Sequence, residues 1–317
     1  MERRKIGKSA LETAPVVFGG NVLGWTVDQA NGFRILDAFL DAGFNAIDTA
    51  DTYSRWIPGN SGGESETIIG NWLKQGGGRR ERVLILTKVG HEMGPGKQGL
   101  SRHYIKSEVE ESLKRLRIET IDLYQSHRDD PSTPMLETLE AYADLIREGK
   151  VRAIGASNFT AKRLREALDV SRAHGLPRYE CLQPRYNLYD RSDYEGELES
   201  LCRKENIGAI PYYGLATGFL TGKYRSPADF KKSPRGGRMA DYLNPRGRKV
   251  LSALDAVSAA HGVNPAAVAL AWLMARPSIT APIASATSVE QLKDFSAAAA
   301  LKLLSAEIAA LDAAGAE

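Results

Sequence analysis

The stretch Phe44-Asn45-Ala46-Ile47-Asp48-Thr49-Ala50-Asp51-Thr52-Tyr53 joins a short apolar run to a carboxylate and then to a phenol. We expect residues 44–47 to form a buried strand that ends at Asp48, and the next turn to bring the Tyr53 hydroxyl back to the same place. Together they would make a proton donor with a charged group beside it. Alternatively, Asp48 caps the next helix and Tyr53 lies on the surface, and this stretch alone favours neither arrangement.

Outward from this stretch, short β-rich apolar runs alternate with longer helical segments, which is typical of repeated βα units. Strands are predicted at residues 16–18, 44–47, 83–87, 122–126, 151–156, 179–182, 207–211 and 279–283. Helices are predicted near 29–42, 64–75, 101–117, 134–148, 160–173, 193–206, 246–275 and 288–300.

Eight such units predict an α/β fold with a single (β/α)8 TIM barrel over residues 1–317. A doubly wound open sheet is the alternative. Residues 3–14, around Gly7, predict an N-terminal β-hairpin, and residues 305–314 predict a last helix. A long loop at about residues 214–247 is rich in Gly, Pro and basic residues, and a loop of this length in a compact domain is usually functional or disordered.

Composition indicates an ordinary soluble globular protein. The 317 residues are 43% apolar and 26% charged, with a net charge of +3. This charge is too small, and the Lys/Arg runs are too short, to predict nucleic acid or a membrane surface as a partner. No signal peptide or membrane-spanning run is recognised. Cys181 and Cys202 form neither a disulfide framework nor a metal-binding spacing, so we expect a reduced cytoplasmic protein without a metal, of undetermined oligomeric state.

Polar side chains follow nearly every predicted strand, where a barrel builds its active site. They are Asp48, Lys88, His127, Ser157, Asn158, Gln183 and Tyr212. Lys88 comes directly after an apolar strand and needs a partner in order to be buried, and Asp48 is the natural one. The alternative is a purely structural ion pair.

Asp48, Tyr53, Lys88 and His127 would together form a proton-transfer group. A free tyrosine has a pKa of about 10, and a nearby ammonium lowers it by favouring the phenolate. His127 would then donate a hydrogen bond to a substrate carbonyl oxygen. The other histidines are interpreted as structural: His91, His103, His174 and His261.

Five segments, in order along the chain, carry a family resemblance. They are Gly43 to Tyr53, Gly63-Glu64-Ser65-Glu66-Thr67-Ile68-Ile69-Gly70, Thr87-Lys88, Asp122-Leu123-Tyr124-Gln125-Ser126-His127, and Gly149-Lys150-Val151-Arg152-Ala153-Ile154-Gly155-Ala156-Ser157-Asn158-Phe159. On them the chain resembles the aldo-keto reductase family, including its bacterial aldehyde/ketone reductase and potassium-channel β-subunit-like branches. The resemblance implies a barrel, a nicotinamide cofactor, Tyr53 as general acid tuned by Lys88 and Asp48, and His127 orienting the carbonyl group.

The same resemblance implies cofactor contacts. Ser157, Asn158 and Gln183 match positions that bind the nicotinamide carboxamide, and Tyr212 matches an aromatic residue that stacks on the ring. Residues 213–223 resemble a pyrophosphate loop, although Tyr213-Gly214 stands where a Ser-Pro pair is common. The implied cofactor-binding residues are Asn21, Asp48, Ser157, Asn158, Gln183, Tyr212, Leu215, Gly218, Leu220, Lys223, Ser285, Thr287 and Gln291.

The adenosine end departs from the family pattern. Residues 284–291 match the segment before the last barrel helix, but the Arg or Lys often used for the 2′-phosphate is missing, and Phe295 stands where Asn is usual. We favour NADP(H) over NAD(H) on the habit of the family. Arg235, Arg238 or Arg246 of the long loop would then replace the missing charge.

These features predict an NAD(P)H-dependent reductase of aldehydes, ketones or sugars, or a dehydrogenase in the reverse direction. Trp25 and Trp56 would line a pocket for a small carbonyl substrate, or pack in the core instead. One alternative is a cofactor-binding regulatory subunit with little turnover. Another is a Schiff-base enzyme with Lys88 as nucleophile.

Overall fold

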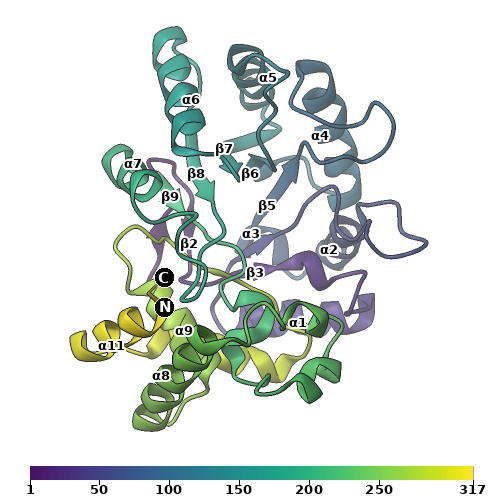
Figure 1. Cartoon of the computed structure of the whole chain (residues 1–317). Helices are drawn as coiled ribbons and strands as arrows, with labels where there is room; N and C mark the ends of the chain where they lie inside the picture. The colour runs from purple at the N-terminus through teal and green to yellow at the C-terminus, as the bar shows by residue number, and fades with distance from the viewer. Residues whose placement is uncertain (317) are drawn as a thin grey trace.

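Eight parallel strands form one curled sheet in the computed structural model, which describes residues 1–316. Their order in the sheet is β10-β3-β4-β5-β6-β7-β8-β9 (Figure 1). Their bounds are β3 (Val17–Gly19), β4 (Ala46–Asp48), β5 (Leu84–Val89), β6 (Ile121–Ser126), β7 (Val151–Ser157), β8 (Tyr179–Gln183), β9 (Gly208–Ala209) and β10 (Ile283–Ala284).

Backbone hydrogen bonds join the two edges of this sheet. The Thr280 N–H donates to the Ala209 carbonyl at 2.8 Å, and the Ile283 N–H donates to the Pro211 carbonyl at 2.9 Å. The predicted barrel is therefore confirmed, and the open doubly wound sheet is wrong.

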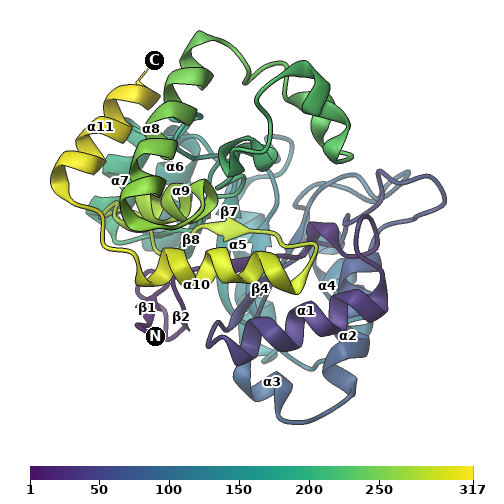
Figure 2. The same ribbon diagram turned by 90° about the horizontal axis from the view of Figure 1, so that it is seen from below.

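Helices surround the sheet in both ribbon views (Figures 1 and 2). They are α1 (Gln29–Asp41), α2 (Glu64–Lys74), α3 (Arg79–Arg82), α4 (Arg102–Leu116), α5 (Met135–Arg147), α6 (Ala161–His174), α7 (Glu197–Glu205), α8 (Pro245–His261), α9 (Pro265–Met274), α10 (Leu292–Ala300) and α11 (Ser305–Gly315). The single helix predicted over residues 246–275 is wrong. The chain breaks there because Gly262 caps α8 with a φ of +63° and Pro265 begins α9.

Short 3-10 helices occupy several loops. They are η1 (Gly20–Val22), η2 (Ala216–Thr221), η3 (Pro227–Lys232), η4 (Gly236–Arg238) and η5 (Val289–Gln291). Three of them lie within the long loop between β9 and α8, so this predicted loop carries local structure of its own.

The predicted hairpin is present and closes the amino-terminal end of the barrel. Its strands, β1 (Arg4–Lys5) and β2 (Glu12–Thr13), pair antiparallel. Ile6 and Leu11 pack with residues inside the barrel. Gly7 has a φ of +61°, and a Cβ there would lie 2.3 Å from the Glu180 carbonyl oxygen, so only glycine fits this approach.

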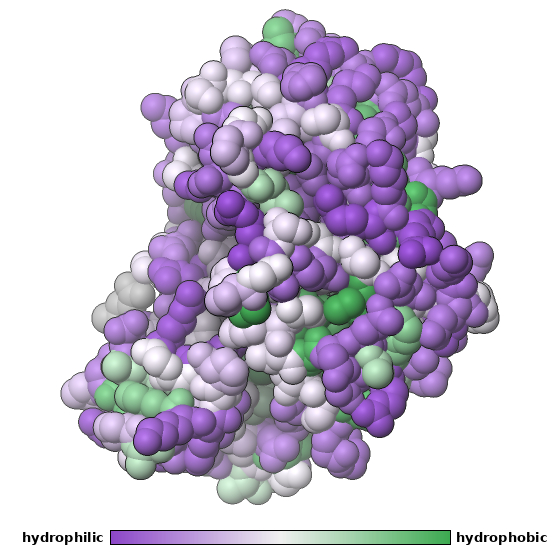
Figure 3. Space-filling view, turned by 90° about the vertical axis from the view of Figure 1, so that its right-hand side faces the viewer, coloured by the Kyte–Doolittle hydropathy of each residue, from purple (hydrophilic) through white to green (hydrophobic). Residues whose placement is uncertain are grey.

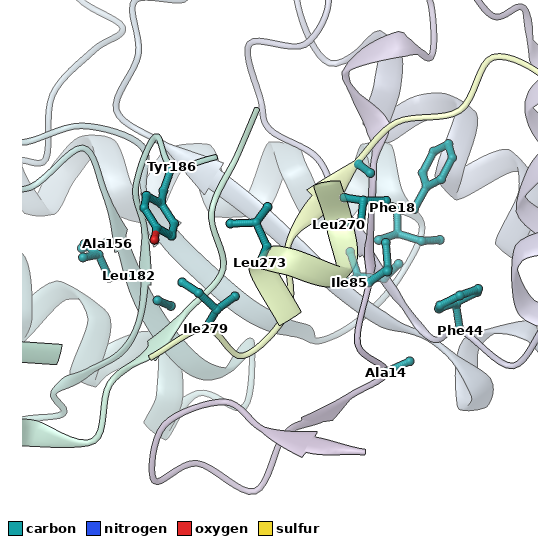
Figure 4. Packing of buried hydrophobic residues seen from close by; sticks show 14 of the residues in the cluster. Ala14, Phe18, Phe44, Ile85, Ala156, Leu182, Tyr186, Leu270, Leu273 and Ile279 are labelled. Atoms are coloured by element: carbon teal, nitrogen blue, oxygen red, sulfur yellow. The ribbon is translucent and has the colours of Figure 1, made fainter. Parts of the chain in front are cut away.

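Alternation along the strands decides which side chains point into the barrel. One hydrophobic cluster fills the interior and includes Ala46, Leu86, Leu123 and Cys181. A larger cluster lies between the sheet and the helices, and Figure 4 shows part of it, from Phe18 and Phe44 to Leu270 and Leu273. Because side chains alternate, the residues two positions after the interior ones also point inward. These are Asp48, Lys88, Gln125 and Gln183.

Neither a metal site nor a spanning helix is found in residues 1–316. No group of three or more metal-ligating side chains is positioned to hold a metal ion. No single helix is long and apolar enough to cross a membrane; α8 and α9 pass that test only as a pair, and a bend of 96° separates them.

Candidate active site

The predicted proton-transfer residues meet at the carboxyl ends of β4, β5 and β6. The Lys88 ammonium is fully buried and donates to Asp48 Oδ2 at 2.6 Å and to the Thr49 carbonyl at 2.8 Å. Its third contact is the Tyr53 hydroxyl at 3.2 Å. The turn after β4 thus returns Tyr53 to the carboxylate, and the surface arrangement for this stretch is excluded.

Asp48 is held from its other side by two amides. Gln183 Nε2 donates to Asp48 Oδ1 at 2.9 Å, and Gln125 Nε2 does so at 3.4 Å. Both carboxylate oxygens of Asp48 therefore accept hydrogen bonds, as burial of a polar group requires. Sequence reasoning placed Gln125 in a motif but gave it no site role. The strand alternation, two residues after the inward-facing Leu123, could have identified it.

The pKa of Tyr53 differs in direction from the sequence prediction. Burial raises the pKa of the phenol, and the Lys88 ammonium acts in the predicted, opposite sense without offsetting it; Asp48 adds to the increase. Tyr53 is therefore protonated at neutral pH. Burial opposes the charge on Lys88, but Asp48 and Tyr53 outweigh it and raise the pKa of the ammonium. A lysine held as an ammonium is a poor nucleophile, which weakens the Schiff-base alternative.

His127 lies next to the Tyr53 ring, with the ring centroids 5.8 Å apart. Burial, and then the Lys88 charge, hold the pKa of His127 well below its usual value, so the imidazole is neutral near pH 7. Its Nδ1 is buried without a hydrogen-bond partner. A neutral imidazole carries one N–H donor, and this suits a carbonyl oxygen placed between His127 and the Tyr53 hydroxyl.

His91, interpreted from the sequence as structural, lies next to this site. Its ring stands edge-on to His127, with a centroid distance of 4.3 Å. Burial lowers the pKa of His91, and Arg128 and Lys88 lower it further. The Gly-rich loop after β5 gave no periodic signal from which this fold-back could be predicted.

The three residues expected to hold a carboxamide lie together at the ends of β7 and β8. Ser157 Oγ donates to the Gln183 carbonyl at 2.9 Å, and Asn158 Nδ2 lies 3.1 Å from Ser157 Oγ. Asn158 Oδ1 accepts from the Tyr212 hydroxyl at 2.8 Å. A hydrogen-bonded chain thus joins Gln183, Ser157 and Asn158 to the hydroxyl of Tyr212.

The expected pyrophosphate loop forms η2, which contains consecutive left-handed residues, Thr217 and Gly218. The N–H groups of Gly218 and Leu220 both donate to the Leu215 carbonyl, at 2.8 and 3.2 Å. Leu220 is fully buried, and Leu215 packs against the core. Lys223 is exposed, and its ammonium lies 5.1 Å from the centre of the Tyr224 ring.

The residues expected near the adenosine lie between β10 and α10, and one of them contacts Asn21, which follows β3. Ser285 Oγ donates to Asn21 Oδ1 at 2.7 Å, which joins the ends of two neighbouring strands. Gln291 Oε1 accepts from the Thr287 N–H at 2.9 Å. Phe295 is buried against Phe44.

The three arginines suggested for the 2′-phosphate have different surroundings. Arg246 donates to the Tyr189 and Gly315 carbonyls, so its guanidinium is directed toward the end of α11. Arg238 donates to the Tyr213 hydroxyl at 3.0 Å. Arg235 lies over the Trp25 ring, with its Cζ 5.1 Å from the ring centre.

The two tryptophans extend outward from Tyr53. The Trp56 ring contacts the Tyr53 ring edge-on at 5.6 Å, and the Trp25 ring contacts Trp56 at 5.9 Å. Trp56 is 47% exposed and Trp25 is partly exposed, so neither is a core residue. They form one continuous aromatic surface beside the phenol.

A buried acidic group behind the site was not anticipated. Asp51 is fully buried, and its Oδ2 has no hydrogen-bond partner. Burial, with repulsion from Glu66 and Glu108, raises the pKa of Asp51 well above its usual value. Arg115 donates to both glutamates, at 2.6 and 2.5 Å. One guanidinium thus serves two buried carboxylates, and Asp51 has no cation of its own, which favours its protonated form.

Comparisons with known proteins identify the family of this chain. The model described as "Aldo/keto reductase family" matches residues 15–316. "Uncharacterized oxidoreductase YrpG" of Bacillus subtilis is 36% identical over 301 residues, which cover 93% of this chain and 90% of that protein. "Protein tas" of Escherichia coli is 31% identical over 92% of this chain and 91% of that protein.

A third similar protein is named as a channel subunit and not as an oxidoreductase. "Putative voltage-gated potassium channel subunit beta" of Schizosaccharomyces pombe is 32% identical over 91% of this chain and 85% of that protein. The family match spans almost the whole barrel, and the similarity extends across nearly the full length of each relative. The chain therefore belongs to the aldo/keto reductase family, a family of oxidoreductases that generally use nicotinamide cofactors.

Proposed function

We propose that this protein is an NADP(H)-dependent oxidoreductase that reduces aldehydes or ketones, sugars among them, to alcohols. The observation that carries the proposal is the Tyr53 hydroxyl, 3.2 Å from a buried Lys88 ammonium and beside the neutral ring of His127. A protonated phenol, a fixed cation and a neutral hydrogen-bond donor are the groups that carbonyl reduction requires.

Each of the four residues has a separate role in protonating the carbonyl oxygen of the substrate. A nicotinamide held at this site would supply the hydride that is added to the carbonyl carbon. His127 donates a hydrogen bond to the oxygen and orients it, and Tyr53 transfers its proton to the same oxygen. Lys88 stabilises the phenolate left on Tyr53, and Asp48 holds Lys88 charged and in position.

The donor groups fit such a cofactor. Ser157, Asn158 and Gln183 present hydroxyl and amide groups that match a carboxamide, and Tyr212 places an aromatic ring beside them. Lys223 forms no ion pair with any carboxylate of residues 1–316 and would attract a phosphate. Ser285, Thr287 and Gln291 would contact the adenosine end of the cofactor. Asn21, which accepts a hydrogen bond from Ser285, would contact the cofactor or the substrate.

The preference for NADP(H) over NAD(H) rests on the habit of the family and on the basic character of the long loop. Arg238 and Lys223 have no carboxylate partner in the described part of the chain. Thr287 and Gln291 are exposed and neutral, so they supply no positive charge for the 2′-phosphate that distinguishes NADP(H). Fluorescence titrations with NADPH and NADH would decide the matter, and equal affinities would refute the preference.

A second candidate function is a cofactor-binding partner subunit, favoured by the name of the potassium-channel relative. The face of the molecule seen in Figure 3 is largely hydrophilic, with hydrophobic residues grouped near its middle. The complete set of Asp48, Tyr53, Lys88 and His127 favours turnover. Tight cofactor binding without reduction of any carbonyl compound would favour the partner role.

Tyr53→Phe tests the proposed chemistry directly. We expect NADPH affinity to be kept and the rate of aldehyde reduction to fall about 10²- to 10⁴-fold, since the variant lacks the acid. Tyr104→Phe is the matched control, because the Tyr104 hydroxyl is buried outside this group and makes no hydrogen bond. A fully active Tyr53→Phe variant would show that Tyr53 is not the proton donor.

A further inference from the structure

An arginine of the long loop reaches the aromatic surface beside the phenol. Arg235 lies just before η4, and its guanidinium stacks over the Trp25 ring at 5.1 Å. Nη2 of this guanidinium is buried and has no hydrogen-bond partner. The Arg235 side chain as a whole is partly exposed and makes no hydrogen bond within residues 1–316, so its outer N–H groups are open to a ligand. Leaving a charged donor unsatisfied is costly, and an anionic ligand would satisfy it.

Carboxylates of the neighbouring loops do not neutralise Arg235. Within residues 1–316, Arg235 forms no ion pair, and the adjacent Arg238 contacts only a hydroxyl, that of Tyr213. No carboxylate of the described residues is among the charged groups that affect the pKa of Arg235, and Asp229 of the same loop pairs with Lys232 at 2.7 Å. The loop therefore brings net positive charge to Trp25.

A chain of ring contacts connects this charge to the reacting group. Arg235 lies over Trp25, Trp25 contacts Trp56, and Trp56 contacts Tyr53. A small molecule lying along these rings would have its carbonyl oxygen at Tyr53 and its far end toward the guanidinium. Trp56 is substantially exposed, so this aromatic surface is accessible.

A second cation lies beyond the two histidines. The His127 ring contacts the Tyr53 ring, the His91 ring contacts His127, and Arg128 is near enough to both imidazoles to lower their pKa. Arg128 is exposed and has no ion-pair partner among the described residues. A neutral carbonyl compound would gain nothing from these two cations, whereas an anionic one would be attracted.

We propose that Arg235 binds an anionic group, a carboxylate or a phosphate, at the far end of the carbonyl substrate. The inference rests on the proposed reductase function and adds the class of substrate. A guanidinium stacked on an indole keeps its in-plane N–H donors free, and these match the two oxygens of a carboxylate or phosphate. The preferred substrates would thus be oxo acids or oxo phosphates rather than neutral aldehydes.

Matched substrate pairs test this with the full-length enzyme and NADPH. The pairs are para-carboxybenzaldehyde with its methyl ester, and succinic semialdehyde with its methyl ester. We expect the wild type to prefer the acid in at least one pair. In Arg235→Met the kcat/KM for that acid should fall on the order of 10- to 100-fold, with the ester within about twofold, since a hydrogen-bonded charge is lost. Arg235→Lys should recover part of the preference.

Controls show whether the anion that Arg235 binds belongs to the substrate or to the cofactor. Arg203→Met removes an exposed arginine from α7 and should change nothing. An unchanged Kd for NADPH in Arg235→Met supports the substrate as the anion. If only the Kd for NADPH rises, Arg235 binds a cofactor phosphate and the inference is wrong. The inference is also wrong if the wild type does not prefer the acid in either pair. It is wrong, too, if Arg235→Met lowers kcat/KM for the acid and for its ester equally.

Failure of the proposed function would be recognised separately. Where no aldehyde is reduced, binding of the unreactive para-(hydroxymethyl)benzoate and of its methyl ester to the NADPH complex can still be measured by calorimetry. Selective binding of the acid that is lost in Arg235→Met would support the anion site alone. Equal binding of both compounds would overturn it.

Discussion

Replacing Lys88 by Met would show whether the buried Lys88–Asp48 pair serves chemistry or only folding. The two side chains are 2.6 Å apart and almost fully buried, so the variant leaves a carboxylate without its counterion. Removing one partner of such a pair costs about 3–5 kcal/mol. Asp48 keeps the hydrogen bond from Gln183, so we expect about 3 kcal/mol. At roughly 2 °C per kcal/mol for a chain of this size, Tm should fall by about 6 °C.

The double variant with Asp48→Asn separates the two roles. It contains no uncompensated charge, so Tm should return to within about 2 °C of the wild type. The rate of NADPH oxidation with an aldehyde should stay depressed on the order of 10²-fold in both variants, because the Tyr53 phenolate has lost its cation. Calorimetry and steady-state kinetics measure the two effects. If the rate recovered together with Tm, Lys88 would be structural and its role in proton transfer would be refuted.

The other buried titratable groups give two predictions about pH. In the unfolded chain His127 would gain a proton below about pH 6.5, whereas in the native state its lowered pKa keeps the imidazole neutral. Acidification therefore lowers the free energy of unfolding by about 1.4 kcal/mol per pH unit. His127→Gln should remove that slope from the urea-unfolding free energy between about pH 6.5 and pH 5, and an unchanged slope would show that His127 is charged in the native state. Native Asp51 keeps its proton above pH 3.8, where the unfolded chain has lost it, so its contribution to stability falls as pH rises. Asp51→Asn should raise Tm at about pH 8 and have little effect near pH 4, with activity kept; a Tm gain that does not depend on pH would contradict this.

Features that depend on local alternation could be predicted from the sequence. Asp48 and Lys88 end apolar strands, so their positions inside the barrel, and their pairing, followed from side-chain direction and from the cost of an unpaired buried charge. Gln125 obeys the same rule, so its inward position beside Asp48 could also have been predicted. The break after α8 also had a signal, since Gly262 and Pro265 are strong helix-ending and helix-starting residues.

Features set by tertiary packing were beyond the sequence. The pKa of Tyr53 depends on how much protein surrounds the phenol, and no spacing along the chain reports that quantity. His91 reaches His127 through a loop without periodic structure. Arg235 was suggested for a phosphate because of its charge, but only the fold places it on Trp25. Loop geometry of this kind depends on long-range contacts, which are set by the whole barrel.

Burial and Lys88 act on Tyr53 at different stages of proton transfer, which explains why a raised pKa suits the proposed reaction. Burial keeps the phenol protonated in the resting enzyme, so an acid is available at neutral pH. An ammonium 3.2 Å away interacts weakly with a neutral phenol but strongly with a phenolate, because attraction between charges grows as the negative charge develops. Lys88 therefore stabilises the transition state more than the ground state, and only such a difference accelerates a step. Asp48 opposes the phenolate, but without it the buried Lys88 could not keep its own charge.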